Sequence, residues 1–224
     1  MEKHKLAERI LATVNLLLGA KGLMLRSGTV VDATLISAPS LTKNASGERD
    51  TEMVSGASAQ PRTSKKGQQW FFGMKAHIGV DADSGLVHTV RGTSGNINDV
   101  VEANSLLHGQ ETDVFADAGY QGAQKRPDAK DDVQWHVAMR PGLRPGLRKL
   151  LDKAEPMEAL SDQVELIKAS IRAKVEHPFR VIKRQFGHVK VRYRGLAKNT
   201  AQLQTLFALA NLWMVRRRLS GSLA

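Results

Sequence analysis

Apolar residues recur at helical spacing near both ends of the chain. Over residues 5–21 they mark one helix face, and two glycines then end the helix: Leu6, Ile10, Val14, Leu17 and Leu18, followed by Gly19 and Gly22. A last helix is predicted from about residue 199 to 219, with the core positions Leu203, Leu206, Phe207, Ala210, Trp213 and Met214. At its C-terminus, Arg216, Arg217 and Arg218 complement the helix dipole.

Between these helices, runs of β-branched and apolar residues predict strands at 29–36, 70–80, 86–90, 112–119 and 133–138. The second and third runs flank Asp81-Ala-Asp-Ser-Gly85, a turn sequence, and so form a hairpin. This sequence faintly resembles a calcium loop, but it lacks the third oxygen ligand and the closing Glu, and a plain turn is expected. A short helix over 99–107 has Asp99 at its cap or in its first turn.

The order strand, hairpin, helix, strand, strand and helices predicts an α/β fold with a mixed sheet flanked by helices. Residues 37–69 form a long polar loop, and the prolines within 141–156 mark a connection. We expect two units. Residues 1–26 are an N-terminal helix, the remnant of a preceding domain, and residues 27–224 form the main domain.

The chain is strongly basic, with 33 Lys and Arg against 22 Asp and Glu. This excess favours a polyanionic partner such as nucleic acid, although a merely basic protein or an RNA-binding protein would show it too. The absence of cysteine excludes disulfides and Cys-ligated zinc and suits a reducing cytoplasm. The apolar stretches 10–20 and 203–215 are shorter than the ~20 residues of a bilayer span, so no membrane partner is expected.

Two carboxylates, Asp32 and Asp117, stand within apolar strands. A buried carboxylate must be neutralised, paired or bound to metal, although a core aspartate bonded to backbone amides would explain either residue alone. A third, Glu176, shares a helix face with Arg172 and Lys183, which a solvated stripe of ion pairs would explain equally well. Pro178 predicts a kink or a fresh helix start, placing Glu176 at the end of a turn.

Three carboxylates without cysteine or a paired-histidine motif point to Mg²⁺ or Mn²⁺, rather than to zinc. Two such ions can activate water or a 3′-OH and stabilise the leaving oxygen, so the reaction class is phosphodiester cleavage and transfer. The histidines His77, His88, His136 and His177 are interpreted as structural rather than as ligands.

Four strings together resemble the DDE transposases of bacterial insertion sequences: residues 28–36, 73–81, 117–122 and 173–180. The resemblance runs from about residue 5 to 219. It implies a ribonuclease-H-like fold, with Asp32, Asp117 and Glu176 as the catalytic triad that binds two metal ions. The group it resembles carries a Tyr, Arg, Glu, Lys signature. Arg172, Glu176 and Lys183 match that signature, whereas Ala169 stands in the Tyr position.

The resemblance implies a cytoplasmic enzyme acting on double-stranded DNA with terminal inverted repeats. Such transposases usually carry a further N-terminal region that helps to bind the repeats. Because this region is absent here, we also consider a catalytically silent, truncated DNA-binding remnant, and a partner that is an N-terminal fragment or a second copy. A host ribonuclease-H-like nuclease would share the triad.

Eight Lys and Arg lie between residues 172 and 194 against one acid, Glu176. Such a run supplies phosphate affinity that is independent of sequence and weakens with salt. The predicted DNA contacts are Arg172, Arg180, Lys183, Arg184, Lys190, Arg192, Arg194 and, beside the aromatic residues 70–72, Lys65 and Lys66.

Overall fold

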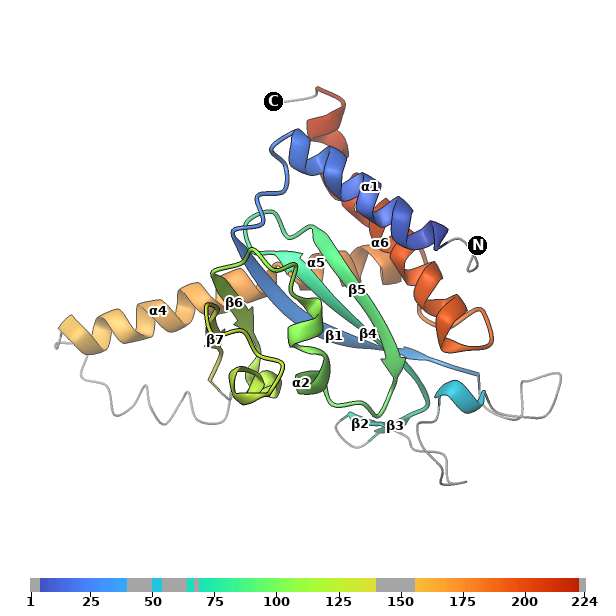
Figure 1. The fold of residues 1–224 in the computed structure, drawn as a ribbon, viewed down its shortest axis with the longest axis horizontal. Helices are drawn as coiled ribbons and strands as arrows, with labels where there is room; N and C mark the ends of the chain where they lie inside the picture. The colour runs from blue at the N-terminus through green and yellow to red at the C-terminus, as the bar shows by residue number, and fades with distance from the viewer. Residues whose placement is uncertain (1–4, 40–49, 54–63, 67–68, 140–155, 222–224) are drawn as a thin grey trace.

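The computed structural model describes residues 5–39, 50–53, 64–66, 69–139 and 156–221 (Figure 1). A five-stranded sheet has the order β5-β4-β1-β6-β7. β1 (Gly28–Ser37), β4 (Gly73–Asp81) and β5 (Val87–Ser94) are antiparallel, whereas β6 (Asp113–Ala116) and β7 (Gln134–Val137) run parallel to β1. The sheet is therefore mixed, and the predicted α/β class is confirmed.

The strands alternate their side chains between two hydrophobic layers. Val30 and Ile36 of β1 belong to the larger layer, together with α5 (Glu176–Arg180) and α6 (Leu196–Leu219). Val31, on the opposite face, packs with residues that follow α2 (Asp99–Glu102). Figure 1 shows α2 on one face of the sheet and α4 (Pro156–Ala173) extending outward on the other side of the molecule.

The helix α1 (Leu6–Ala20) lies beside α6 at the β5 edge of the sheet (Figure 1). Asn211 of α6 bonds both the N–H and the C=O of Val87, at 2.8 and 2.7 Å, and donates to the Asn15 side chain of α1 at 3.0 Å. Asn15 in turn donates to the carbonyl of His88. These two buried amides satisfy backbone groups of an edge strand that would otherwise be open to pairing. The division of the chain at residue 26 stays a prediction.

The segment 37–69 was expected to be a loop, and its described parts contain local structure. A one-turn helix spans Thr51–Met53, and Met53 is buried in the larger layer. β2 (Ser64–Lys66) pairs with β3 (Gln69–Phe71) in a small separate hairpin. The predicted strand 70–80 is therefore two strands, β3 and β4. The connection predicted at 141–156 lies almost entirely outside the described residues.

The fresh helix start that was predicted around Pro178 is confirmed, and the break itself lies at residues 174–175. α4 ends at Ala173, the turn at Lys174 and Val175 has i to i+3 bonds, and α5 begins at Glu176. Pro178 then sits in the first turn of α5, where a residue without an N–H is tolerated, while its ring disfavours the helix before it. Glu176 consequently starts a helix instead of ending a turn.

Most predicted core positions of α6 are confirmed, since Leu203, Phe207 and Ala210 are fully buried. The exception is Trp213, which is 38% exposed. Its ring packs edge-on against Phe186, 6.4 Å between centroids, and the guanidinium of Arg216 covers it at 4.2 Å. The helical period places Trp213 at the margin of the apolar face, so the core prediction was wrong there.

Candidate active site

Asp32 lies on β1, and Asp117 directly follows β6, the parallel strand next to β1. The register pairs Val30 of β1 with Phe115 of β6. Continued by two residues, one of them beyond the end of β6, this register would set Asp32 level with Asp117. Adjacent strands are about 4.8 Å apart, and residues level with each other in neighbouring strands point to the same face. Val30 and Phe115 both pack in the larger layer, so both carboxylates belong to the face covered by α4 and α5.

The local sequence explains why each carboxylate is held where it is. Asp32 interrupts an apolar strand, and its Oδ1 accepts a hydrogen bond from the amide of Ala33 at 2.7 Å. Asp117 follows the last residue of β6 and caps the one-turn helix Ala118–Tyr120, where it accepts from the Gly119 amide at 2.8 Å. The small residues after Asp117 let the chain turn closely around its side chain.

The environment of Asp32 disfavours its ionised form. Burial raises the pKa of Asp32 to about 7, and the neighbouring charges of Asp117 and Asp99 act in the same direction. The Ala33 amide and the Arg172 guanidinium oppose the rise without cancelling it. An ionised Asp32 therefore needs more positive charge than the described residues supply.

Two cations from the helix layer reach this part of the sheet. A guanidinium nitrogen of Arg172, near the end of α4, lies 3.9 Å from the carboxylate of Asp117. The ammonium group of Lys183, in the π-helical turn Val181–Gln185, donates to the hydroxyl of Thr34 at 2.5 Å. Thr34 is two residues beyond Asp32 on the same face of β1.

Glu176 is placed between these two contacts along the chain, but no bond joins it to either aspartate. Its side chain is exposed, and it has no hydrogen bond or ion pair within the described residues. Across that same part of the chain, no three His, Asp or Glu side chains are close enough together to hold a metal ion. The structure thus brings Asp32 and Asp117 together and leaves the position of the third carboxylate a prediction.

The predicted DNA-contacting residues lie mostly on the molecular surface. The side chains of Arg180, Arg184, Lys190, Arg192 and Arg194 are exposed. Lys190 forms an isolated bridge with Ser37, which brings this segment alongside the end of β1. Lys65 and Lys66 lie on β2, and their side chains fall outside the described residues.

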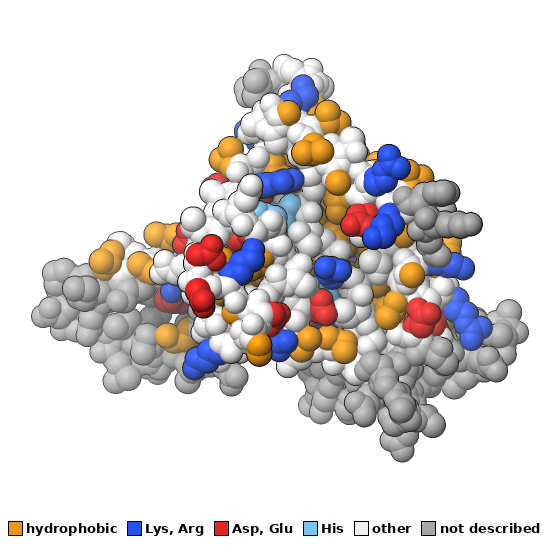
Figure 2. All heavy atoms as spheres, viewed as in Figure 1, with side chains coloured by type: hydrophobic (Ala, Val, Ile, Leu, Met, Phe, Trp, Pro, Cys, Tyr) orange, Lys and Arg blue, Asp and Glu red, His pale blue; other side chains and the backbone are white. Residues whose placement is uncertain are grey.

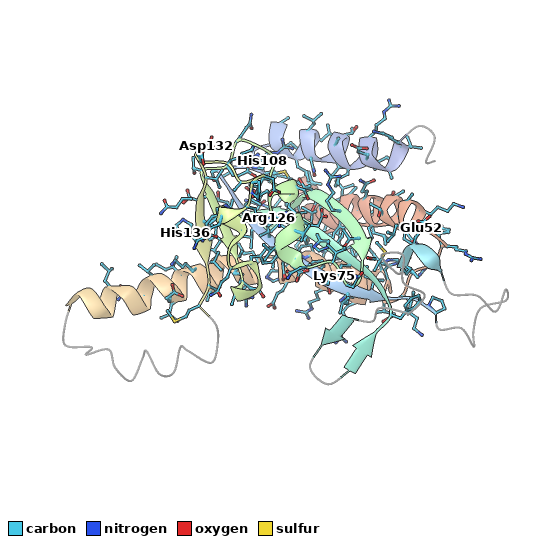
Figure 3. The ribbon with its side chains drawn as sticks, turned by 60° about the horizontal axis from the view of Figure 1, so that its bottom comes forward. Glu52, Lys75, His108, Arg126, Asp132 and His136 are labelled. Carbon is cyan, nitrogen blue, oxygen red and sulfur yellow. The ribbon has the colours of Figure 1, made fainter. Side chains whose placement is uncertain are left out.

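Three of the four histidines that were interpreted as structural have protein partners. His77 is buried and bonds Thr93 at 2.8 Å, and His88 bonds Thr29 at 3.1 Å. His136, on the outermost strand β7 (Figure 3), bonds Asp113 at 2.7 Å. His177 is exposed.

The turn after β4 is held by its own aspartate. The Asp81 carboxylate accepts from the amides of Arg26 and Ser84, at 2.8 and 2.9 Å, and from the Ser84 hydroxyl. These bonds occupy the carboxylate oxygens, and β4 and β5 pair on either side of the turn, so the predicted hairpin is confirmed.

Two residues near the aspartates were missed by the sequence analysis. The hydroxyl of Tyr120 is buried and has no hydrogen-bond partner within the described residues. Burial, followed by the charges of Asp32, Asp99 and Asp117, raises the pKa of Tyr120. Asp99 is tied to β4 by Lys75 at 2.9 Å. The string Asp117-Ala-Gly-Tyr120 was the available signal for Tyr120, whereas the sequence marked Asp99 only as a residue at the start of a helix.

Comparison with known proteins gives one family. Residues 24–212 match the family described as "Transposase DDE domain". No solved structure matches the chain. Within the described residues, no helix combines the length and apolar character that a membrane crossing needs.

Proposed function

Because the chain belongs to the transposase DDE-domain family, we propose that it cleaves DNA at the ends of an insertion sequence and joins the strands to a target. Its mixed α/β sheet flanked by helices is the ribonuclease-H-like fold of that family. Asp32, Asp117 and Glu176 are the proposed catalytic residues. The observation that carries the proposal is the placement of Asp32, on β1, beside Asp117, at the end of the parallel strand β6, with Arg172 of the helix layer against Asp117.

The residues present fit a hard divalent cation. Asp32 is a partly buried carboxylate whose pKa is raised to about 7, and a second carboxylate stands beside it, so a bound cation would relieve an electrostatic cost. Carboxylate oxygens are the ligands that Mg²⁺ and Mn²⁺ prefer. Asp32, Asp117 and Glu176 would hold the metal, which when bound in a pair activates the attacking water or 3′-OH and stabilises the leaving oxygen.

The contacts made by residues on either side of Glu176 support it as the third ligand. Arg172 is four residues before it and lies against Asp117, and Lys183 is seven residues after it and lies against Thr34. The three residues lie in three successive segments, at the end of α4, at the start of α5 and in the turn after α5, so the support comes from these two contacts. Glu176 therefore lies between two contacts with the same region of β1 and β6. Its unpaired, exposed carboxylate is free to turn toward the aspartates.

The cations around the aspartates have a second role in the proposal. Strand cleavage builds negative charge on phosphate oxygens, and preorganised donors next to that position stabilise the transition state. Arg172 and Lys183 would contact the phosphates that flank the scissile bond. The exposed Arg180 and Arg184, on the same segment, would add phosphate affinity without reading sequence.

The test is strand nicking of a duplex that carries the terminal repeats of the element, with and without Mg²⁺. Asp117→Asn and Glu176→Gln should abolish Mg²⁺-dependent nicking. Asp113→Asn is the matched control, because Asp113 lies on the same strand four residues earlier and is bonded to His136. If Asp117→Asn nicks as fast as wild type, the assignment fails. Activity on any duplex regardless of its ends would instead favour a general nuclease.

A second candidate function is DNA binding without catalysis. It is favoured by one observation: the described residues contain no three acidic or histidine side chains grouped for a metal. Salt-sensitive DNA binding by the wild type, with no nicking in either Mg²⁺ or Mn²⁺, would support this candidate over the first.

A further inference from the structure

Three arginines at the end of α6 form an unpaired basic cluster outside the segment 172–194. Arg216, Arg217 and Arg218 are all exposed. Arg216 donates to the carbonyl of Trp213 at 2.7 Å, and none of the three has an ion-pair partner in the part of the chain that the structure describes. The interaction of a cation with the helix dipole is small and confined to the last turn, so one cation would be enough for it. The dipole therefore does not explain why three arginines stand there.

The exposed side chain of Trp213 holds one arginine of this cluster in place. Residues spaced by three and four share a helix face, so Arg216 and Arg217 lie on the same side of α6 as Trp213. Arg216 lies over that ring at 4.2 Å, and the stacking fixes the direction of its guanidinium. A planar cation held in one direction on a surface loses less entropy on binding a phosphate than a free side chain does.

The cluster continues the basic surface of the active-site helices. Trp213 contacts Phe186, which directly follows the turn carrying Lys183 and Arg184. Further along, Gly85 of the β4–β5 turn approaches both the Lys174 backbone and the Met214 side chain. The end of α6 therefore adjoins the layer that faces Asp32 and Asp117.

We infer that Trp213, Arg216 and Arg217, with Arg218 beside them, contact the sugar–phosphate backbone of duplex DNA that extends beyond the cleaved site. This inference rests on the proposed function and adds a contact that lies outside the triad and outside the run 172–194. The helix rise places Arg217 about 6 Å beyond Trp213, close to the ~7 Å that two nucleotides advance along a duplex. The contact would be independent of sequence, and it would form only when the duplex is long enough to reach the end of α6.

The test compares duplex lengths in an Asp117→Asn background, so that cleavage does not disturb the binding measurement. Arg216→Ala, Arg217→Ala and Arg218→Ala are combined, and affinity is measured for a short and a long duplex over a range of salt. On the long duplex the triple variant should bind on the order of tenfold more weakly, with a salt slope smaller by about 2 to 3. On the short duplex its affinity should match that of the unaltered background.

Two controls separate charge from folding. The triple lysine variant of the same positions keeps the charge and should retain most of the long-duplex affinity. A variant losing Arg91, Lys125 and Lys130 removes the same charge from exposed positions on the α2 side of the sheet. On that face acidic side chains are interspersed with basic ones (Figure 2). We therefore expect this control variant to keep the full salt dependence of DNA affinity.

The outcomes are distinguishable. The inference would be overturned if the triple alanine variant had the same affinity and salt slope as its background. It would also be overturned if the variant lost the same affinity on both duplexes. Either result would leave the proposed function standing. Preferential binding of the intact protein to anionic phosphatidylserine vesicles, abolished in the triple variant, would assign the cluster to a membrane surface and also overturn it. Failure of the background protein to bind any duplex would contradict the proposed function itself.

Discussion

The ammonium group of Lys183 lies 2.5 Å from the hydroxyl oxygen of Thr34, two residues along β1 from Asp32. A residue from the helix layer, 149 positions away in sequence, thus reaches the strand that carries the first aspartate. Together with the approach of Arg172 to Asp117, this contact fixes which face of the sheet the segment around Glu176 covers.

Replacing Lys183 with Met should slow Mg²⁺-dependent nicking on the order of 10²-fold, because a preorganised cation next to the scissile phosphate would be lost. The stability of the fold should change little, since the aliphatic stem is retained. Single-turnover nicking measures the effect. Arg184→Met, which removes the adjacent exposed cation, should have a much smaller one. Equal losses in the two variants would mean that Lys183 contributes only general phosphate affinity.

Asn211→Leu should destabilise the protein by about 2–4 kcal/mol, measured by urea unfolding. The substitution removes the bonds to both backbone groups of Val87 and to Asn15, and it leaves those buried groups unpaired. Thr205→Ala, on the same helix, loses only a hydroxyl that bonds the carbonyl one turn earlier. If the urea midpoint of Asn211→Leu equalled that of Thr205→Ala, the hydrogen bonds of the Asn211 and Asn15 side chains would not be what holds α1 and α6 to the sheet edge.

The buried histidines should lower the stability of the fold as the pH falls from neutrality, whereas the raised pKa of Asp32 acts in the opposite direction. Burial lowers the pKa of His77 to about 4 and that of His88 to about 3. In the unfolded chain these rings take up a proton near their ordinary pKa of about 6.5, whereas in the folded protein they stay neutral to a lower pH. The neutral rings therefore contribute fully to the free energy of unfolding above pH 6.5, and this contribution is lost toward pH 4. Between pH 7 and pH 5 each ring should cost about 2 kcal/mol.

The histidine contribution is checked by measuring the free energy of unfolding of wild type and of His77→Gln at pH 7 and pH 5. The variant should lose less stability than wild type on acidification, even if it is less stable at pH 7. His177→Gln, at an exposed position, should follow the wild-type slope. Parallel slopes for wild type and His77→Gln would exclude His77 as a source of the pH dependence.

The positions of the two aspartates could be predicted from sequence because their signal is local. Each stands in or directly after a short run of β-branched and small apolar residues, which predicts a strand wherever the run occurs. That the strands are neighbours, parallel and level with each other is a long-range property. It depends on the pairing of Val30 with Phe115, which no local pattern encodes.

Other features were missed for different reasons. The helix break precedes Pro178 because a proline is accommodated in a first turn and disrupts the turn before it. Trp213 fits the helical period of the core, but Arg216 and Phe186 provide it with partners at the surface. The influence of Asp99 on Asp32 arises across the fold, between residues 67 positions apart.

The most direct test is to locate the metal. Crystals of the protein with Mn²⁺ and a terminal-repeat duplex, measured for anomalous scattering, should show manganese about 2.1 Å from carboxylate oxygens of Asp32, Asp117 and Glu176. Manganese bound elsewhere, or bound to the two aspartates with Glu176 still turned to solvent in the DNA complex, would contradict the three-carboxylate site.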